Sequence, residues 1–273
     1  MTPSAHRLIR ANNALWARLY YDELVERPGY QLTLLRGADA GFYSCAQALT
    51  RADGEVLAEI EAYYRGKGVA PAVYLDPESP PALLPALQAA GWREVPQEEE
   101  RCHVLDLSAL HAGPPSRARL KPAAARVEAV RLTGPEDPLL AAFLDVDAEV
   151  NELPPTVRAS LTRHLRAPRV DEAAVHCFVA LLDGAVVATR VVGLVGDLAL
   201  CAEGATLPAH RRGGIYSSLL LEGLHFARAA GARTAFLTAS STAHSNLAVA
   251  KLGFTHAFSR TYHRAPVARL KAS

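Results

Sequence analysis

In the second half of the chain, hydrophobic and polar positions follow two periods that replace each other in turn. Apolar runs typical of strands occupy residues 125–132, 175–182, 185–194, 198–207 and 233–239. Apolar positions at helical spacing occupy residues 136–150, 155–165, 215–230 and 244–252. Asp183-Gly184 between two strand runs predicts a hairpin turn, and two strand-like pieces, 254–258 and 260–264, close the chain. The predicted element order is β-αα-βββ-α-β-α-ββ.

The first part of the chain carries fewer clear patterns, but it ends like the second. Helical spacing at 54–67 and 81–90 brackets a short strand at 72–75, and a strand at 100–107 follows. Leu-Gln-Ala-Ala-Gly-Trp, which ends at Trp92, occupies the same place as Val-Ala-Lys-Leu-Gly-Phe, which ends at Phe254. This correspondence predicts an internal duplication.

A break between the two parts sets the predicted domain boundaries. Gly113-Pro114-Pro115 interrupts regular structure, and the basic residues around it lack apolar periodicity. We interpret this stretch as a solvated connector, with a phosphate-contacting arm as the alternative. The predicted fold class is therefore α/β, with two related domains that each have a mixed central sheet flanked by helices. They span residues 1–107, an incomplete or degenerate copy, and 124–273, with a linker at 108–123.

Composition and charge narrow the function classes. Half of the 273 residues are apolar, a fifth are charged, and the net charge is +1, so no overall field attracts nucleic acid or membrane surfaces. No apolar run is long enough to span a bilayer, and the N-terminus lacks a signal-peptide core. The four cysteines form no CxxC pair, which favours reduced thiols in the cytoplasm over a disulfide or a metal site. Ten histidines show no zinc-binding spacing, so we expect no metal.

The segment from Pro208 to Tyr216 gives the most direct indication of a ligand. It joins a strand run to a helix run, and it places Arg211, Arg212, Gly213 and Gly214 at the start of the helix. The N–H groups and dipole of a helix N-terminus bind phosphate, and glycines allow the backbone to approach closely. A glycine-rich turn that only begins the helix is the alternative. The first copy has Asp53-Gly54-Glu55 at the corresponding place, where its carboxylates would repel phosphate.

These residues carry a resemblance to a known family. The pattern P-x-x-R-x-x-G at a strand-to-helix junction resembles the acyl-CoA loop of the GNAT N-acetyltransferase superfamily. Ser245-Asn246 at the start of the next helix, Leu252-Gly253-Phe254 at its end and the element order are similar to that family as well. The loop departs from the family pattern at Tyr216, where a small residue is usual. The resemblance covers residues 124–265 well and the first part only as a degenerate copy.

The resemblance implies acetyl-CoA as co-substrate and assigns residues to it. The pyrophosphate would bind the loop, and the pantetheine would bind the backbone of Thr206 and Leu207, one of whose N–H groups would also polarise the thioester carbonyl. Asn246 would reach the pantetheine, unless it serves only as a helix cap. The residues implied to bind the co-substrate are Thr206, Leu207, Arg211, Arg212, Gly213, Gly214, Ile215, Tyr216 and Asn246.

The chemical step depends on proton transfer. Family members often place a carboxylate general base on the strand before the loop, and Glu203 lies there; an outward-facing or paired glutamate is the alternative. The family's usual proton donor is a tyrosine four residues before the glycine of the L-G-F motif, and this chain has Val249 there. Tyr262, Tyr216 and Ser245 are the candidate replacements, and Tyr262 joins Glu203 as a predicted catalytic residue. The thiolate can also leave without help.

The predicted function is acetyl transfer from acetyl-CoA to an amine by direct attack, in a cytoplasmic monomer or homodimer. A non-catalytic acyl-CoA-binding or regulatory protein is the alternative. The acceptor is a small-molecule or peptide amine that no motif identifies, with no nucleic-acid or membrane partner. The acidic run at 97–100 is either a solvated strand entrance or one wall of a groove for a cationic substrate.

Overall fold

The computed structural model describes residues 2–38, 43–110, 127–167, 174–241, 243 and 245–266, without the side chains of Ser245 and Leu247. Twelve strands form one sheet, in the order β1-β2-β3-β4-β12-β6-β11-β10-β9-β8-β7, with β5 paired to β12. We call residues 2–110 the N-terminal half and residues 127–266 the C-terminal half. The helices and strands of the N-terminal half are α1 (Ala5–Trp16), β1 (Glu23–Arg27), β2 (Tyr30–Leu34), β3 (Ala46–Gln47), α2 (Gly54–Gly66), β4 (Ala72–Leu75), α3 (Leu83–Ala89), β5 (Arg93–Glu94) and β6 (Glu100–Asp106).

The C-terminal half follows the predicted alternation. Its helices and strands are β7 (Glu128–Arg131), α5 (Leu140–Val150), α6 (Pro155–Arg166), β8 (Val175–Leu182), β9 (Ala185–Val195), β10 (Leu198–Thr206), α7 (Ile215–Ala229), β11 (Thr234–Ser240), α8 (Ser245–Lys251) and β12 (Thr255–Arg264). Asp183 and Gly184, both with positive φ, form the β8–β9 turn. Gly231, with φ +96°, follows the end of α7.

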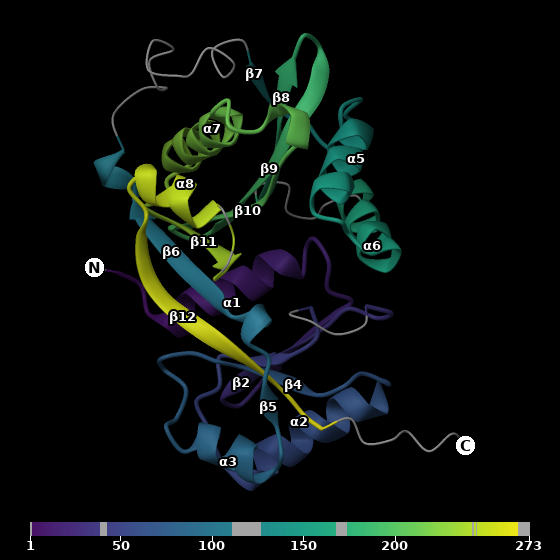
Figure 1. The fold of residues 1–273 in the computed structure, drawn as a ribbon, viewed down its shortest axis with the longest axis vertical. Coiled ribbons are helices and arrows are strands. Elements are labelled where there is room, and N and C mark those ends of the chain that lie inside the picture. Colours follow the sequence, from purple (N-terminus) through teal and green to yellow (C-terminus); the bar gives the residue numbers. More distant parts are fainter. Residues whose placement is uncertain are drawn as a thin grey trace.

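The two halves exchange strands. Strand β6 of the N-terminal half lies between β11 and β12 and is antiparallel to both. Strand β12 passes in the other direction: its first part pairs with β6, and Thr261–Arg264 pairs with β4. In Figure 1 the yellow β12 runs from the strands of the C-terminal half down to those of the N-terminal half. Neither half therefore completes its sheet from its own residues.

Helices cover both faces of the sheet in the C-terminal half. Figure 1 shows α7 and α8 on one side of these strands and α5 and α6 on the other. The core under α7 and α8 contains Leu220, Leu224 and Val249, all fully buried. The opposite core joins α5 and α6 to α1 of the N-terminal half, so the N-terminal half supplies a covering helix as well as a strand. A third core packs α2 and α3 on β2 and β4.

Arg260 fastens β12 where it passes between the halves. Its guanidinium, 4% exposed, donates to Glu100 of β6 at 2.6 and 2.9 Å and to Gln47 of β3 at 2.5 Å. Tyr74 of β4 stacks on the guanidinium, 4.1 Å from its ring centroid. Three strands of the N-terminal half thus converge on one buried cation of β12, which stabilises the exchanged arrangement.

One expectation about the fold needs correction. The two closing strand pieces predicted at 254–258 and 260–264 form one continuous strand, because a bulge between His256 and Phe258 lets β12 bend without breaking. The exchange of β6 and β12 between the halves had no counterpart in the sequence predictions. Helix α1 and strands β1 to β3 had no sequence prediction. The predicted linker lies outside the described residues, except for Ser108–Leu110.

Two features bear on the environment of the chain. All four cysteines are buried and free. Among the described residues, none of the helices has the length and apolar character required to cross a bilayer.

Candidate active site

A cavity of about 350 Å³ opens where β10 and β11 diverge. These parallel strands pair only over Leu198–Leu200 and Thr234–Phe236. Past that point β10 contributes Leu200 to Gly204 to the cavity wall, and β11 contributes Thr238 to Ser240. The gap lies within the sheet itself, so a ligand there can meet main-chain groups as well as side chains.

Glu203 reaches this cavity because the strand bulges. The register of β10 against β9 shifts between Ala202 and Ala205, and Glu203 adopts a left-handed φ of +46°. The next residue, Gly204, makes room on the opposite side: a Cβ there would overlap the guanidinium of Arg190 on β9. The bulge thus exposes a carboxylate to the cavity and leaves space for a cation behind it.

Buried groups from distant parts of the chain surround the Glu203 carboxyl. Asp147 of α5 and Tyr20, which follows α1, are both fully buried beside it, and Tyr43 lies near. Burial raises the pKa of Glu203 from 4.5 to about 7, against the opposing effects of Tyr20, Asp147 and the Arg190 cation. Burial and the neighbouring Glu203 charge also raise the pKa of Asp147. A carboxyl that titrates near neutrality can accept a proton from an amine.

Asp147 is held in place by two further contacts. Asn151 Nδ2 donates to Asp147 Oδ1 at 3.0 Å, and the Thr189 hydroxyl lies 3.4 Å from the same oxygen. Thr189 Oγ1 also lies 3.5 Å from the carbonyl oxygen of Glu203. Thr189 therefore connects the buried aspartate to the bulge.

The N-terminal half builds the outer wall of the cavity. Trp16 and Tyr43 line it with rings 5.8 Å apart, and Tyr20 packs behind both. The residues from Gln97 to Glu100 add an acidic edge. The degenerate copy thus contributes side chains to the candidate site as well as the strand β6.

The predicted phosphate loop has the geometry of an anion cradle. After a short 3-10 turn at Pro208–His210, Arg212 and Gly214 adopt left-handed φ values of +64° and +85°. Helix α7 begins after Gly214, and no side chain caps it. Its first-turn N–H groups are therefore not satisfied by a cap, which is the condition under which a helix N-terminus binds an anion. Arg211 Nε donates to the Thr206 carbonyl oxygen at 3.0 Å, so this side chain also anchors the loop.

Thr206 and Leu207, the two residues expected to bind the pantetheine through their backbone, differ in whether their N–H group is available to a ligand. The Leu207 N–H donates to Val187 O of β9 at 3.0 Å, which corrects the expectation that it is available to a ligand. Because successive N–H groups along a strand point to opposite edges, the Thr206 N–H points away from β9, toward the gap beside β11. Thr206 retains the predicted geometry.

The other loop residues divide their roles between backbone and side chain. Ile215 is 2% exposed and packs in the core, so only its N–H can serve a ligand. The Tyr216 ring turns inward and lies 4.5 Å from Arg190 Cζ. This packing explains how a large residue fits where the family pattern has a small one.

Asn246 has a local role. Its Nδ2 lies 3.0 Å from Ser240 O and 3.3 Å from Ser241 O, and its Oδ1 lies 3.1 Å from His103 Nε2 of β6. These contacts join the end of β11 to α8 and to the exchanged strand. They match the interpretation of Asn246 as a structural residue, since its polar atoms are already engaged.

The structure contradicts the prediction that Tyr262 is the proton donor. It is fully buried opposite Tyr74 in the β12–β4 pairing and does not line the cavity that holds Glu203. The exchange of β12 explains the error, because it carries Tyr262 into the N-terminal half. Val249 is also fully buried.

Sequence reasoning missed the residues that surround Glu203. The sequence could have indicated Asp147, because it lies on the apolar face of α5 formed by Phe143, Leu144 and Val146. A carboxylate is rarely buried on such a face unless it has a specific role. The aromatic residues near the N-terminus and Arg190, on a strand read as apolar, carry no such indication, because their positions depend on the packing of α1 against the other half.

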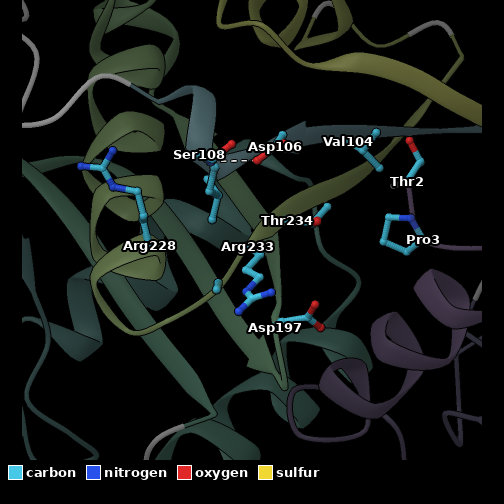
Figure 2. Close-up of a pocket in the computed structure, with 11 residues that line it drawn as sticks. Thr2, Pro3, Val104, Asp106, Ser108, Asp197, Arg228, Arg233 and Thr234 are labelled. Atoms are coloured by element: carbon cyan, nitrogen blue, oxygen red, sulfur yellow. Dashed lines mark hydrogen bonds between the residues drawn. The ribbon is translucent and has the colours of Figure 1, made fainter.

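A larger cavity of about 630 Å³ lies at the opposite end of the same strands (Figure 2). Asp106, Asp197 and Arg233 line it, with Thr2 and Pro3 at one side, and it contains none of the predicted site residues. No group of three or more His, Cys, Asp or Glu side chains suited to a metal ion occurs in the described part of the chain.

Comparisons with known proteins agree with this geometry. The model of the acetyltransferase (GNAT) family matches residues 144–254. A GCN5-related N-acetyltransferase from Kribbella flavida is similar over 99% of this chain and 98% of its own, with a TM-score of 0.69 and 19% identity. A tandem GNAT protein of the clavulanic acid biosynthesis pathway is similar over 88% and 79%, with a TM-score of 0.64 and 19% identity. A GCN5-related N-acetyltransferase from Sphaerobacter thermophilus is similar over 96% and 85%, with a TM-score of 0.64 and 15% identity.

No curated protein matched the chain. At these identities the solved structures establish the fold, and they confirm the predicted tandem α/β architecture over most of the chain. The family match falls in the C-terminal half, where the loop and Glu203 lie. Residues 144–254 thus match the model of the acetyltransferase (GNAT) family, within a chain that has the fold of a tandem GNAT protein.

Proposed function

We propose that this protein is an N-acetyltransferase that moves the acetyl group of acetyl-CoA onto a primary amine. The observation that carries the proposal is Glu203, a carboxyl with a pKa of about 7 that faces the gap between β10 and β11. A base of this kind can remove a proton from a protonated amine and so generate the neutral nucleophile.

The donor site is proposed at the start of α7. The residues there fit a pyrophosphate, because the helix has no side-chain cap and Arg212 and Gly214 turn the backbone as an anion cradle requires. Arg211 and Arg212 are exposed and add positive charge at the same end. The backbone of Thr206 would meet the pantetheine and thioester. No metal is needed for binding.

The reaction then follows from the positions of these groups. Glu203 accepts a proton from the ammonium group of the acceptor, and the amine nitrogen forms a bond to the acetyl carbonyl carbon. The Thr206 N–H stabilises the negative charge that develops on the carbonyl oxygen. The carbon–sulfur bond breaks with its electron pair on sulfur, and the thiolate, with a pKa of ~8–9, takes a proton from water. The second amine proton neutralises the hydroxide that remains, and Glu203 releases its proton to solvent. The carboxylate is thereby restored, and the products are the acetamide, CoA thiol and one proton.

A non-catalytic acyl-CoA-binding protein is the second candidate. It is favoured by one observation: Val249 occupies the family's usual proton-donor position and lies in the core, and Tyr262 is buried in the N-terminal half. The two candidates share the donor site and differ only in turnover. In either case we propose a cytoplasmic location, for which the four free cysteines are the support.

One experiment separates them. Purified protein is mixed with acetyl-CoA and a panel of primary amines, and free CoA thiol is measured over time; a thermal melt with acetyl-CoA is run in parallel. We expect a rise in melting temperature, since a ligand that binds the native state stabilises it, and thiol release that depends on the amine. A raised melting temperature without release for any amine would support the second candidate. No change in either measurement would refute both.

A further inference from the structure

We propose that the acceptor is a small dicationic amine, whose second ammonium group binds between the acidic residues Glu98 and Glu99 and the rings of Trp16 and Tyr43. This inference rests on the proposed function and specifies its substrate class. It concerns the part of the cavity that the N-terminal half builds, away from the phosphate loop.

Among the described residues, the charged side chains that line the cavity are all acidic. Glu98, Glu99, Glu100 and Glu203 face it, and none of the lysines or arginines in the described ranges does so. Glu100 is neutralised by Arg260. Glu98 and Glu99 are half-buried, and in the described part of the chain no ion pair or hydrogen bond engages their carboxylates. A cleft lined by one sign of charge concentrates the opposite charge, so this edge favours a cation.

A second set of acceptors without enough hydrogen-bond donors lies at Glu203, behind the cavity wall. Asp147 is fully buried beside Glu203, and no described N–H group donates a hydrogen bond to its Oδ2 atom. Two adjacent carboxyl groups that share few donors favour a ligand rich in N–H groups. A primary ammonium group supplies three such donors.

Aromatic rings form a further part of the cavity wall. Trp16 and Tyr43 both line the cavity, with their ring centroids 5.8 Å apart and their planes inclined at 48°. The face of an aromatic ring attracts a cation, and tryptophan is the strongest of the three aromatic side chains in this respect. Rings and carboxylates at one edge make a site for an ammonium group rather than for an uncharged apolar tail.

The same lining argues against other acceptors. An amino acid would bring a carboxylate into a cavity where none of the described lining residues is a cation that could receive it. A cavity of about 350 Å³, part of which must hold the acetyl thioester, leaves room only for a small molecule. A short diamine satisfies both sets of acceptors: one amine reacts at Glu203 while the other ammonium group lies at the acidic edge.

The kinetic test compares three probes of matched length: 1,4-diaminobutane, butylamine and 4-aminobutanoate. We expect kcat/KM for the diamine to exceed that for butylamine by at least tenfold, mainly through KM, and 4-aminobutanoate to be poorer than butylamine. We also expect the diamine preference to fall as salt is raised, since exposed charges are screened. Equal kcat/KM for diamine and butylamine would overturn the proposal.

Variants locate the second ammonium group. In the double variant E98Q/E99Q the ratio of kcat/KM for diamine over butylamine should fall about tenfold, whereas Glu55→Gln, at an exposed position of α2, should keep it. Tyr43→Leu, which removes the ring, should lower the ratio, and Tyr43→Phe, which keeps the ring, should restore most of it. An unchanged ratio in both E98Q/E99Q and Tyr43→Leu would contradict the assignment.

A binding measurement separates this inference from the proposed function. Isothermal titration calorimetry of the wild-type protein with 1,4-diaminobutane should show binding that weakens about tenfold in E98Q/E99Q. Binding without thiol release would support the cation site and refute the acetyltransferase proposal. Turnover of butylamine without diamine binding would do the reverse, and neither binding nor turnover would refute both.

Discussion

Glu203 lies between buried groups that act on it in opposite directions. Desolvation raises the pKa of its carboxyl to about 7, while Arg190, Tyr20 and Asp147 lower it. In the unfolded chain this carboxyl has an ordinary pKa of 4.5. The folded state therefore binds the proton more tightly, and the stability that this provides is complete below about pH 4.5 and is lost as the pH rises through about 7.

Replacing Glu203 should stabilise the protein in a pH-dependent way. In Glu203→Gln the side chain cannot ionise, so at pH 8 we expect the variant to gain up to about 3 kcal/mol over the wild type, relative to their difference at pH 4. Urea unfolding at both pH values measures this. Glu149→Gln, at an exposed position of α5, is the control and should change stability by less than about 0.5 kcal/mol at either pH. A Glu203→Gln difference that does not depend on pH would contradict the burial of an ionisable carboxyl.

Gly214 tests the donor site with a control that the chain itself offers. Gly214→Glu places a carboxylate at the start of α7, where it should abolish acetyl-CoA binding by repelling the pyrophosphate. Gly184 in the β8–β9 turn has nearly the same φ, +84° against +85°, so Gly184→Glu introduces a similar backbone strain of about 1–2 kcal/mol away from the loop. Calorimetric titration should show lost affinity in the first variant and wild-type affinity in the second. Retained binding in Gly214→Glu would refute the assignment of the loop.

At the scale of elements, the exchange of β6 and β12 depends on a buried ion pair. Arg260→Ala leaves Glu100 without its partner, and we expect a loss of about 3–5 kcal/mol in the free energy of unfolding. Arg158 and Asp145 form an exposed pair at 2.5 Å, so Arg158→Ala should cost less than about 1 kcal/mol. Denaturant unfolding of both variants provides the comparison. Similar small losses in the two would show that the Arg260 pair does not hold the exchanged strands.

The helices and strands also show which parts of the fold could be predicted from the sequence. The strand and helix bounds of the C-terminal half were predicted within a few residues, because the period of apolar positions reports directly on which face is buried. Strand exchange was not predictable, since the apolar pattern of β6 or β12 reports which positions are buried and not which strands lie beside them. Tyr262 was misplaced for that reason, while Glu203 and the loop lie on elements whose neighbours are local in sequence.

At the scale of the whole molecule, the N-terminal half completes the C-terminal half. It supplies β6 to the sheet, α1 to one core, and Trp16 and Tyr43 to the cavity. The sequence identified it only as a degenerate copy without a ligand loop, since contacts between distant segments leave no local pattern. The N-terminal half is therefore part of the candidate site, although the predicted phosphate loop lies in the other half.

This dependence predicts how fragments behave. Residues 1–110 and 127–273 produced separately should each fail to unfold cooperatively, because each lacks strands that the other holds. Produced together, they should copurify as one complex that binds acetyl-CoA. Circular dichroism and affinity purification measure this. A cooperative melt for residues 127–273 alone would contradict the mutual completion of the two halves.

The central claim, that Glu203 is the base in an amine acetylation, is tested most directly by the pH dependence of kcat. Amine-dependent release of CoA thiol is measured from pH 5.5 to 9 for the wild type and Glu203→Gln, at saturating acetyl-CoA and 1,4-diaminobutane. The account predicts that wild-type kcat rises with pH and levels off above about pH 7, and that Glu203→Gln lowers kcat about 10²- to 10³-fold and loses this step. An unchanged kcat and pH profile in Glu203→Gln would contradict it.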